Sequence, residues 1–241
     1  KFSFTLYKDS KFWVPPIISD EMATLSANKN PALENADAQL FLAYENNTIV
    51  GRVAAIINWT EVKEQKVLKM RFGWFDAINN IEVTKALLNK IAEIGKANNL
   101  EFIEGPVGFS NLDKNGALTE GFNHIGTMAT WYNHPYYIEH FEALGLKREK
   151  EYIESKFDFT EAPSERFKRV NKLITKRYNL RPGNFTKSKD IIPHLDTMFA
   201  LFNKSYSKAK ISGGMNSKLN TNNSEISRIL KQNEYLNSKL F

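Results

Sequence analysis

The chain has 241 residues, 42% of them apolar, so it is long enough to bury a substantial core and to form more than one domain. It has no cysteine, which excludes disulfides and thiolate catalysis and fits a cytoplasmic protein, and it has no run of 18 apolar residues, so no membrane partner is expected. The net charge of +6 is uneven, because residues 1–146 carry 13 basic and 17 acidic side chains and residues 147–241 carry 20 and 10.

The first 60 residues predict an extended N-terminal segment, a short helix and a β-hairpin. Residues 13–16 contain two prolines and favour an extended path, and a short helix is expected around Glu21–Ala27. Leu40–Ala43 and Ile49–Ile57 have the composition of strands. Asn46 and Asn47 lie between them, and asparagine readily adopts the positive φ of a tight hairpin turn.

Residues 66–105 have the pattern of a βαβ crossover. Val67–Phe75 is a β-rich apolar run, and apolar residues then recur at helical spacing from Ile81 to Ile94. Leu100–Ile103 is a second short apolar run. Two parallel strands joined through a helix are therefore expected.

The helix start in such a unit is where a diphosphate is most easily held, so its position suggests a nucleotide-type cofactor. The sequence there contains no glycine, and Asp76 and Glu82 would repel phosphate. Asn79, followed three residues later by Glu82, instead has the pattern of an ordinary helix cap.

Gly105 and Pro106 end the second strand abruptly, and proline cannot donate to a strand ladder. Two neighbouring strands would separate there and leave backbone groups free to hold an extended amide chain. The alternative is that residues 104–122 form a long loop over the core. Tyr132, Tyr136 and Tyr137 open the next helix beside this point, where a hydroxyl could protonate a leaving thiolate or simply contribute packing.

The remaining chain predicts three parts with different character. Residues 1–162 form the first domain, which closes with a strand at Tyr152–Phe159. Residues 163–211 begin a second α/β lobe. Residues 212–241, rich in Asn, Ser and Lys, predict poor order or a weak helix. The second lobe is expected to contain a helix over 167–178, a possible strand at Leu180–Phe185 and a helix at Ile191–Tyr206.

Residues 166–189 contain nine Lys or Arg and no acidic residue. This density could attract RNA or an acidic partner, or it could be a solvated helix face. The candidate contacts are Arg166, Lys168, Arg169, Lys172, Lys176, Arg177 and Arg181. The four histidines show no metal-ligand spacing, so no metal is expected.

Several of these stretches resemble the GNAT superfamily of N-acyltransferases, in a divergent bacterial branch. The likeness covers about residues 2–159. It rests on LYKDSKFWVPP (6–16), VGRVAAII (50–57), residues 72–88, GPVGFSNLDKNGALTEGF (105–122) and YNHPYYIEHFEALGL (132–146). The resemblance implies an α/β fold of the GNAT-like acyl-CoA N-acyltransferase type, with a mixed twisted sheet and a central crossover.

The resemblance also implies a reaction and its residues. An acyl group would move from acetyl-CoA or another acyl-CoA, lying between the two crossover strands, to the amine of a small molecule or peptide. The implied cofactor-binding residues are Phe75, Asp76 and Ala77 for the pantetheine, with Asn79, Asn80, Ile81 and Asn133. The implied catalytic residues are Glu104 as base and Tyr136, Tyr137 or Tyr132 as acid.

Two departures from the superfamily pattern keep other functions open. The diphosphate loop has no glycine, and Phe141 stands four residues before Gly145, where many members have a tyrosine acid. One alternative is therefore a catalytically silent GNAT-fold binding module. The other is an aminoacyl-tRNA-dependent transferase with a basic, tRNA-contacting second lobe, and the end at Phe241 suggests a truncated tandem-lobe protein.

Overall fold

The computed structural model describes residues 1–110, 113–127, 130–156, 158 and 165–206. These residues divide into two compact units, of which the larger contains residues 1–152 and the smaller contains residues 153–204. The predicted domain boundary at residues 162 and 163 and the predicted segment 212–241 lie outside the described residues.

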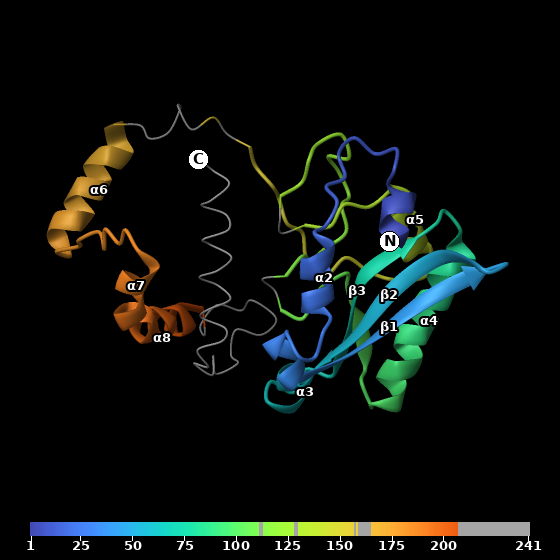
Figure 1. Cartoon of the computed structure of the whole chain (residues 1–241). Coiled ribbons are helices and arrows are strands. Elements are labelled where there is room, and N and C mark those ends of the chain that lie inside the picture. Colours follow the sequence, from blue (N-terminus) through green and yellow to red (C-terminus); the bar gives the residue numbers. More distant parts are fainter. Residues whose placement is uncertain (111–112, 128–129, 157, 159–164, 207–241) are drawn as a thin grey trace. The chain divides into compact units, whose positions relative to one another are not determined.

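The larger unit is built on a mixed four-stranded sheet with the order β1–β2–β3–β4 (Figure 1). β1 (Ala36–Glu45) and β2 (Thr48–Asn58) are antiparallel and form the predicted hairpin. Asn46 and Asn47 have φ of 46° and 63°, which confirms the asparagine turn.

The predicted βαβ crossover is present. β3 (Lys69–Ala77) pairs antiparallel with β2, and β4 (Phe102–Glu104) runs parallel to β3. α4 (Ile81–Ala97) connects these two strands. Its buried stripe packs on β2 and β3 and contains Val83, Leu87, Leu88, Ile91 and Ile94. The chain is therefore an α+β protein.

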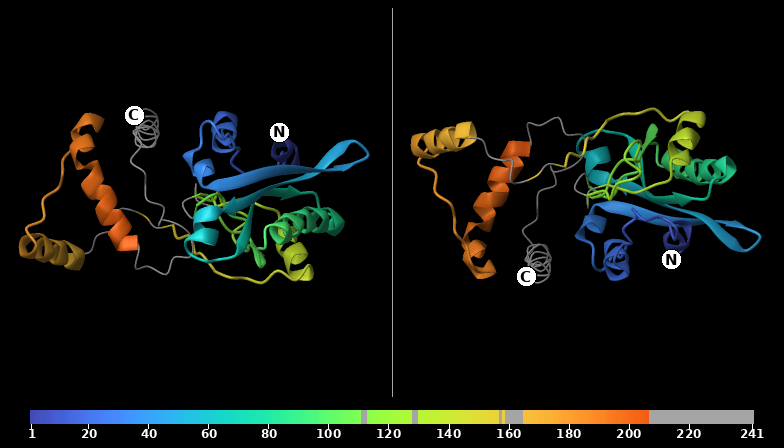
Figure 2. Two further views of the ribbon diagram at one scale, coloured as in Figure 1. Left: turned by 90° about the horizontal axis from the view of Figure 1, so that it is seen from below. Right: turned by 90° about the horizontal axis from the view of Figure 1, so that it is seen from above.

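Helices lie on both faces of the sheet (Figure 2). α4 and α5 (Tyr136–Ala143) lie on one face, and α1 (Phe2–Leu6) and α2 (Ile18–Thr24) lie on the other. The sheet thus has an apolar cluster on each side, the larger under α4 and the smaller around Trp74 and Phe109. No local sequence pattern predicted α1, η1 (Pro31–Glu34) or α3 (Trp59–Lys63).

α5 ends at a glycine in the left-handed conformation. Gly145 has φ of 86°, its amide donates to the Glu142 carbonyl, and the Leu146 amide donates to the Phe141 carbonyl. This pair of bonds is a Schellman motif, which favours glycine at that position. Pro135 is the N-cap of the helix and precedes its first turn.

The smaller unit contains helices only, in the part that the structure describes. They are α6 (Glu165–Arg177), α7 (Ser188–Ile191), η3 (Ile192–His194) and α8 (Leu195–Tyr206). α6 confirms the helix predicted over residues 167–178. Pro193 lies within η3, inside the second predicted helix, which the structure divides into η3 and α8.

Two predicted strands are wrong over the residues that the structure describes. Leu180–Phe185 has no strand geometry, and neither do residues 152–156 and 158; Phe157 and Phe159 lie outside the described part. Both segments are exposed, and no described strand pairs with them. Alternating apolar residues form a strand only where a neighbouring strand accepts their backbone hydrogen bonds.

Candidate functional site

β3 extends well past its parallel partner β4. The ladder between them joins only Lys69–Arg71 to Phe102–Glu104. The chain then passes through a cis Gly105–Pro106 bond, and the Val107 amide donates to the Phe72 carbonyl at 2.8 Å. The last residues of β3 therefore have no β4 residue in register with them.

Two tyrosines of α5 bind the backbone of Ala77, the final residue of β3. The Ala77 amide donates to the Tyr137 hydroxyl at 2.9 Å, and the Tyr136 hydroxyl donates to the Ala77 carbonyl at 2.8 Å. Side chains thus take the two backbone groups that a neighbouring strand would otherwise bind. Tyr132 is not part of this arrangement, because its hydroxyl donates to the Phe122 carbonyl at 3.3 Å.

A chain of hydrogen bonds runs from Tyr137 to Arg52. The hydroxyls of Tyr137 and Tyr7 lie 3.1 Å apart, and Tyr7 donates to Asp76 Oδ1 at 2.9 Å. Arg52 Nε donates to Asp76 Oδ2 at 2.6 Å. Tyr7 has one proton and gives it to Asp76, so Tyr137 is the donor to Tyr7. Every member of this buried chain is satisfied, which fixes its geometry.

Burial sets the protonation of these groups. It raises the pKa of Tyr7, Tyr137 and Tyr136 above the usual tyrosine value, and the charge of Asp76 raises it further. Burial also raises the pKa of the Asp76 carboxyl, and the neighbouring Arg52 opposes this effect. The three hydroxyls therefore keep their protons at neutral pH and act as hydrogen-bond donors.

A β-bulge lies in β3 next to this chain of hydrogen bonds. The register of β2 with β3 shifts between Arg52 and Ala54, so Trp74 and Phe75 of β3 lie opposite a single residue. Trp74 has φ of 46°, a left-handed conformation that bulky side chains rarely adopt. Strained backbone of this kind is concentrated at functional sites.

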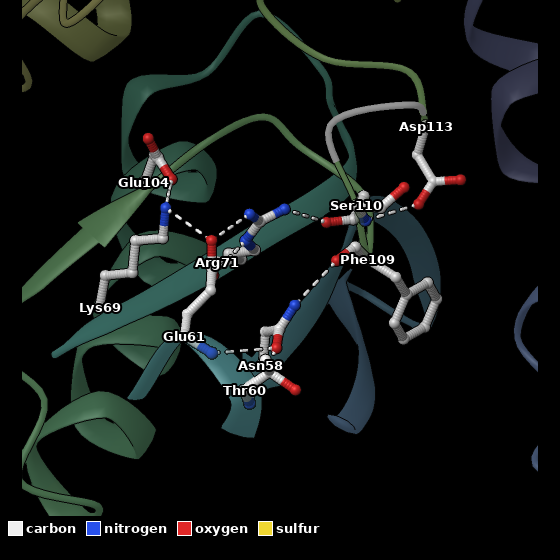
Figure 3. A network of polar contacts seen from close by, with 10 residues as sticks. Asn58, Thr60, Glu61, Lys69, Arg71, Glu104, Phe109, Ser110 and Asp113 are labelled. Atoms are coloured by element: carbon white, nitrogen blue, oxygen red, sulfur yellow. Dashed lines mark hydrogen bonds and ion pairs between the residues drawn. The ribbon is translucent and has the colours of Figure 1, made fainter. Parts of the chain in front are cut away.

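A second buried polar cluster lies at the start of β3 (Figure 3). Arg71 Nε and Nη2 donate to the two carboxylate oxygens of Glu61 at 2.8 and 2.5 Å. Lys69 Nζ lies 3.1 Å from Glu61 Oε1 and 2.6 Å from Glu104 Oε2. The predicted base Glu104 is thus ion-paired with Lys69 through Oε2.

The same cluster fixes the loop that follows β4. Arg71 Nη1 donates to the Gly108 carbonyl at 3.0 Å, and Asn58 Nδ2 donates to the Phe109 carbonyl at 3.3 Å. Within the loop, the Ser110 amide donates to Asp113 Oδ2 at 2.8 Å (Figure 3). The loop is therefore held against β2 and β3 by buried side chains.

The helix start expected to hold a diphosphate is capped by its own asparagine. The N-cap is Asn80, one residue after the predicted Asn79, and its Oδ1 accepts from the Glu82 amide at 3.0 Å. The Asn80 carbonyl accepts from the amides of Val83 and Thr84. Three amides of the first turn are thus engaged within the helix, which leaves little for a diphosphate.

The other residues predicted to bind the cofactor lie in different surroundings. Asn79 and Ile81 are exposed beside the cap, whereas Phe75 is buried against Tyr137 and Phe141. Asn133 is also buried, and its amide group bonds to both backbone groups of Leu118. Asn133 therefore braces a loop.

Sequence reasoning missed Tyr7, Arg52 and Trp74 as parts of the site. Tyr7 and Asp76 are 69 residues apart, and no local pattern connects them. Arg52 did offer a signal, because it is a charged residue inside the apolar run of residues 49–57. A charge in a buried strand generally has a buried partner.

The smaller unit contains the candidate contacts for RNA or an acidic partner. All of residues 165–187 are exposed, including the seven basic residues named above. Within the residues described, no group of three or more His, Cys, Asp or Glu has metal-ligand geometry. The same residues include no helix long and apolar enough to span a bilayer.

Comparison with known proteins gives two relatives. No protein-family model and no solved structure matches the chain significantly. The chain is 30% identical over 147 residues to protein YghO of Escherichia coli K12, which covers 61% of this chain and 37% of YghO. It is 28% identical over 112 residues to a bacterial ceramide synthase of Caulobacter vibrioides, which covers 46% of this chain and 29% of the synthase. The match thus spans about a third of the length of these relatives.

Proposed function

We propose that the chain is an N-acyltransferase with a GNAT-like fold, which moves an acyl group from a thioester donor such as acyl-CoA to an amine. The observation that supports this most is the end of β3 at Ala77. There the strand has left its parallel partner, and two protonated tyrosines bind its backbone. An acyl-thioester reaction needs backbone groups to align an extended amide carrier and a donor for the departing thiolate.

The similarity to a bacterial ceramide synthase supports the same chemistry. Ceramide is an amide between a fatty acid and an amino alcohol, so an enzyme that makes it forms an N-acyl bond. Only the class of reaction, N-acyl bond formation, is inferred for the present chain, because the match covers less than half of the chain.

The proposed reaction is a direct transfer. The amine nitrogen attacks the thioester carbonyl carbon, the C–N bond forms, and the C–S bond breaks. The departing thiolate takes a proton from the Tyr136 hydroxyl, and the proton lost by the amine restores that hydroxyl through solvent. Tyr136 suits this role better than Tyr137, because Tyr136 is half-buried whereas Tyr137 is enclosed between Ala77 and Tyr7.

The experiment combines thiol release with product identification. The purified chain is incubated with acetyl-CoA or palmitoyl-CoA and a set of primary amines, free thiol is followed by colorimetry, and the amide is identified by mass spectrometry. Tyr136→Phe is expected to lower turnover about 100-fold, as loss of a general acid does, and Tyr132→Phe is the matched control. If no donor gives an amide and none raises the melting temperature, the proposal is wrong.

A catalytically silent binding module is the second candidate. The Asn80 cap and the engagement of both tyrosines with Ala77 favour it, because neither the helix start nor the hydroxyls are free. Such a module would be stabilised by a ligand without releasing thiol. Aminoacyl transfer from tRNA is a third candidate, favoured by the exposed basic residues of α6, and salt-dependent retention of tRNA would support it.

A further inference from the structure

Two indole groups on the α2 side of the sheet lack hydrogen-bond acceptors. The Nε1 atoms of Trp74 and Trp131 are buried, and neither has an acceptor within hydrogen-bonding distance in the part of the chain that the structure describes. The two rings are in contact, with centroids 5.6 Å apart and planes at 71°. An indole N–H only donates, so the two rings cannot satisfy each other.

The position of the Trp74 indole is fixed from several sides. Trp74 is 6% exposed and packs against Phe109 at 5.8 Å between ring centroids. Phe109 lies in the loop after β4, and its carbonyl accepts a hydrogen bond from Asn58 Nδ2. The left-handed φ of Trp74 adds strain to this arrangement, and strain persists only where the surroundings impose it. The unpartnered N–H is therefore part of a rigid, preorganised structure.

Lys114 adds a positive charge to the pair. Its Nζ lies 5.4 Å from the centroid of the Trp131 ring, and no described acidic side chain forms an ion pair with it. The adjacent Asp113 directs Oδ2 to the Ser110 amide. An ammonium group thus lies over the ring of Trp131, one of two neighbouring indoles whose N–H groups have no acceptor, and an anionic oxygen group is the ligand that best satisfies such donors.

We propose that Trp74, Trp131 and Lys114 form a binding site for a carboxylate. The proposal goes beyond the proposed function and does not rest on it, because the two indoles lie on the α2 side of the sheet, whereas Tyr136 and Tyr137 lie on α5, on the opposite side (Figure 2).

The test uses three matched ligands and the indole N–H signals in a 15N-HSQC spectrum. 6-Aminohexanoate carries both groups, hexanoate carries only the carboxylate, and hexylamine carries only the amine. Trp74→Phe and Trp131→Phe assign the two signals. Trp59 is an internal reference, because its Nε1 already donates to Asp37 Oδ2 at 2.8 Å.

We expect 6-aminohexanoate and hexanoate to move the Trp74 and Trp131 signals downfield, toward the position of Trp59, and hexylamine to leave them unchanged. Lys114→Met keeps the side-chain stem and removes the charge, so it should weaken the binding of both carboxylates about tenfold. If Trp74→Phe does not fold, assignment through Trp131→Phe and the effect of Lys114→Met still decide the matter.

Signals that do not move with either carboxylate would overturn the proposal and indicate that water satisfies the two N–H groups. Equal movement with hexylamine would also overturn it, because the site would then recognise the alkyl chain. The binding measurement needs no acyl donor. If the carboxylates bind at the indoles and no amide forms in the acyl-transfer assay, the carboxylate site stands and the proposed reaction fails.

Discussion

The amide of Ala77 donates a hydrogen bond to the hydroxyl of Tyr137 at 2.9 Å, across 60 residues of sequence. This bond joins the last residue of β3 to the first turn of α5. The same hydroxyl bonds to Tyr7, so Tyr137 connects the strand, α5 and the N-terminal segment. Tyr137 is therefore the structural member of the tyrosine pair, whereas Tyr136 is only half-buried.

Removing the hydroxyl of Tyr137 should destabilise the protein. In Tyr137→Phe, the Ala77 amide loses its acceptor and the Tyr7 hydroxyl loses its donor. We expect the free energy of unfolding to fall by about 1–3 kcal/mol, the cost of leaving a buried polar group unpaired. Urea denaturation followed by tryptophan fluorescence measures this change.

The matched control is Tyr44→Phe, because Tyr44 lies on the edge strand β1 and is 61% exposed. Its free energy of unfolding should stay within about 0.5 kcal/mol of the wild-type value. An equal loss in both variants would contradict a special role for the Tyr137 hydroxyl.

Neutralising Glu61 should be more damaging. Glu61 is 1% exposed and faces both Arg71 and Lys69. In Glu61→Gln, Arg71 and Lys69 lose the carboxylate that they share, and Lys69 keeps its contact with Glu104. We expect a loss of about 3–5 kcal/mol, since breaking a buried pair leaves an uncompensated charge. Chemical denaturation again provides the measurement.

The surface pair Lys90–Glu93 serves as the control for this variant, with Nζ and Oε1 at 2.7 Å. Glu93→Gln should cost less than about 1 kcal/mol, because solvent screens exposed pairs. If Glu61→Gln behaves like Glu93→Gln, the cluster in Figure 3 does not depend on the charge of Glu61.

The hairpin and the crossover could be predicted because their signals are local. Strand-like apolar composition indicates β1 and β2, the 3.6-residue repeat indicates α4, and Asn46–Asn47 marks the turn between β1 and β2. The helix cap was misplaced by one residue because Asn79 and Asn80 are both suitable cap residues. The extended backbone of Asn80, with φ of −146°, decides between them, and the sequence does not contain that information.

The site could be predicted only in part, because its bonds are long-range. The tyrosines were expected near the end of the crossover, since a proline and three aromatic residues open α5. Their binding to Ala77 and the connection through Tyr7 to Asp76 depend on tertiary packing. The strand predicted at Leu180–Phe185 is wrong for a related reason. The apolar pattern of these residues is local, and it does not show whether a neighbouring strand is available to pair with them.

His140 should make stability depend on pH. Burial lowers the pKa of His140 below its usual value, and Nδ1 lies 2.9 Å from the Thr84 hydroxyl. Because of this lower pKa, the His140 imidazole binds a proton more readily in the unfolded chain than in the folded one. The contribution of His140 to stability is present above about pH 6.5 and is lost as the pH falls from there through the folded-state pKa.

The measurement compares the free energy of unfolding of the wild type and His140→Gln between about pH 7 and pH 5. The wild type should lose more stability than the variant over this range, and the other three histidines are present in both proteins. Parallel curves, or a steeper fall in the variant, would show that His140 is not held neutral by the fold.

The capped start of α4 leads to a prediction about the acyl donor. Asn80 binds the Glu82, Val83 and Thr84 amides, so the helix start offers little to the diphosphate of CoA. If binding comes from the pantetheine arm beside β3, acyl-pantetheine, which lacks the diphosphate and the nucleotide, should bind within about threefold of the matching acyl-CoA. Competition binding with the two donors at equal chain length measures this ratio.

An affinity for acyl-CoA more than about tenfold higher would mean that the diphosphate has a site of its own. Asn80→Ala then locates that site. Loss of the cap should lower the free energy of unfolding by about 1 kcal/mol. If the diphosphate binds elsewhere, the ratio of the affinities for acyl-CoA and acyl-pantetheine should stay unchanged. A ratio that rises in Asn80→Ala would place the diphosphate at the amides that Asn80 normally occupies, where it would compete with the cap.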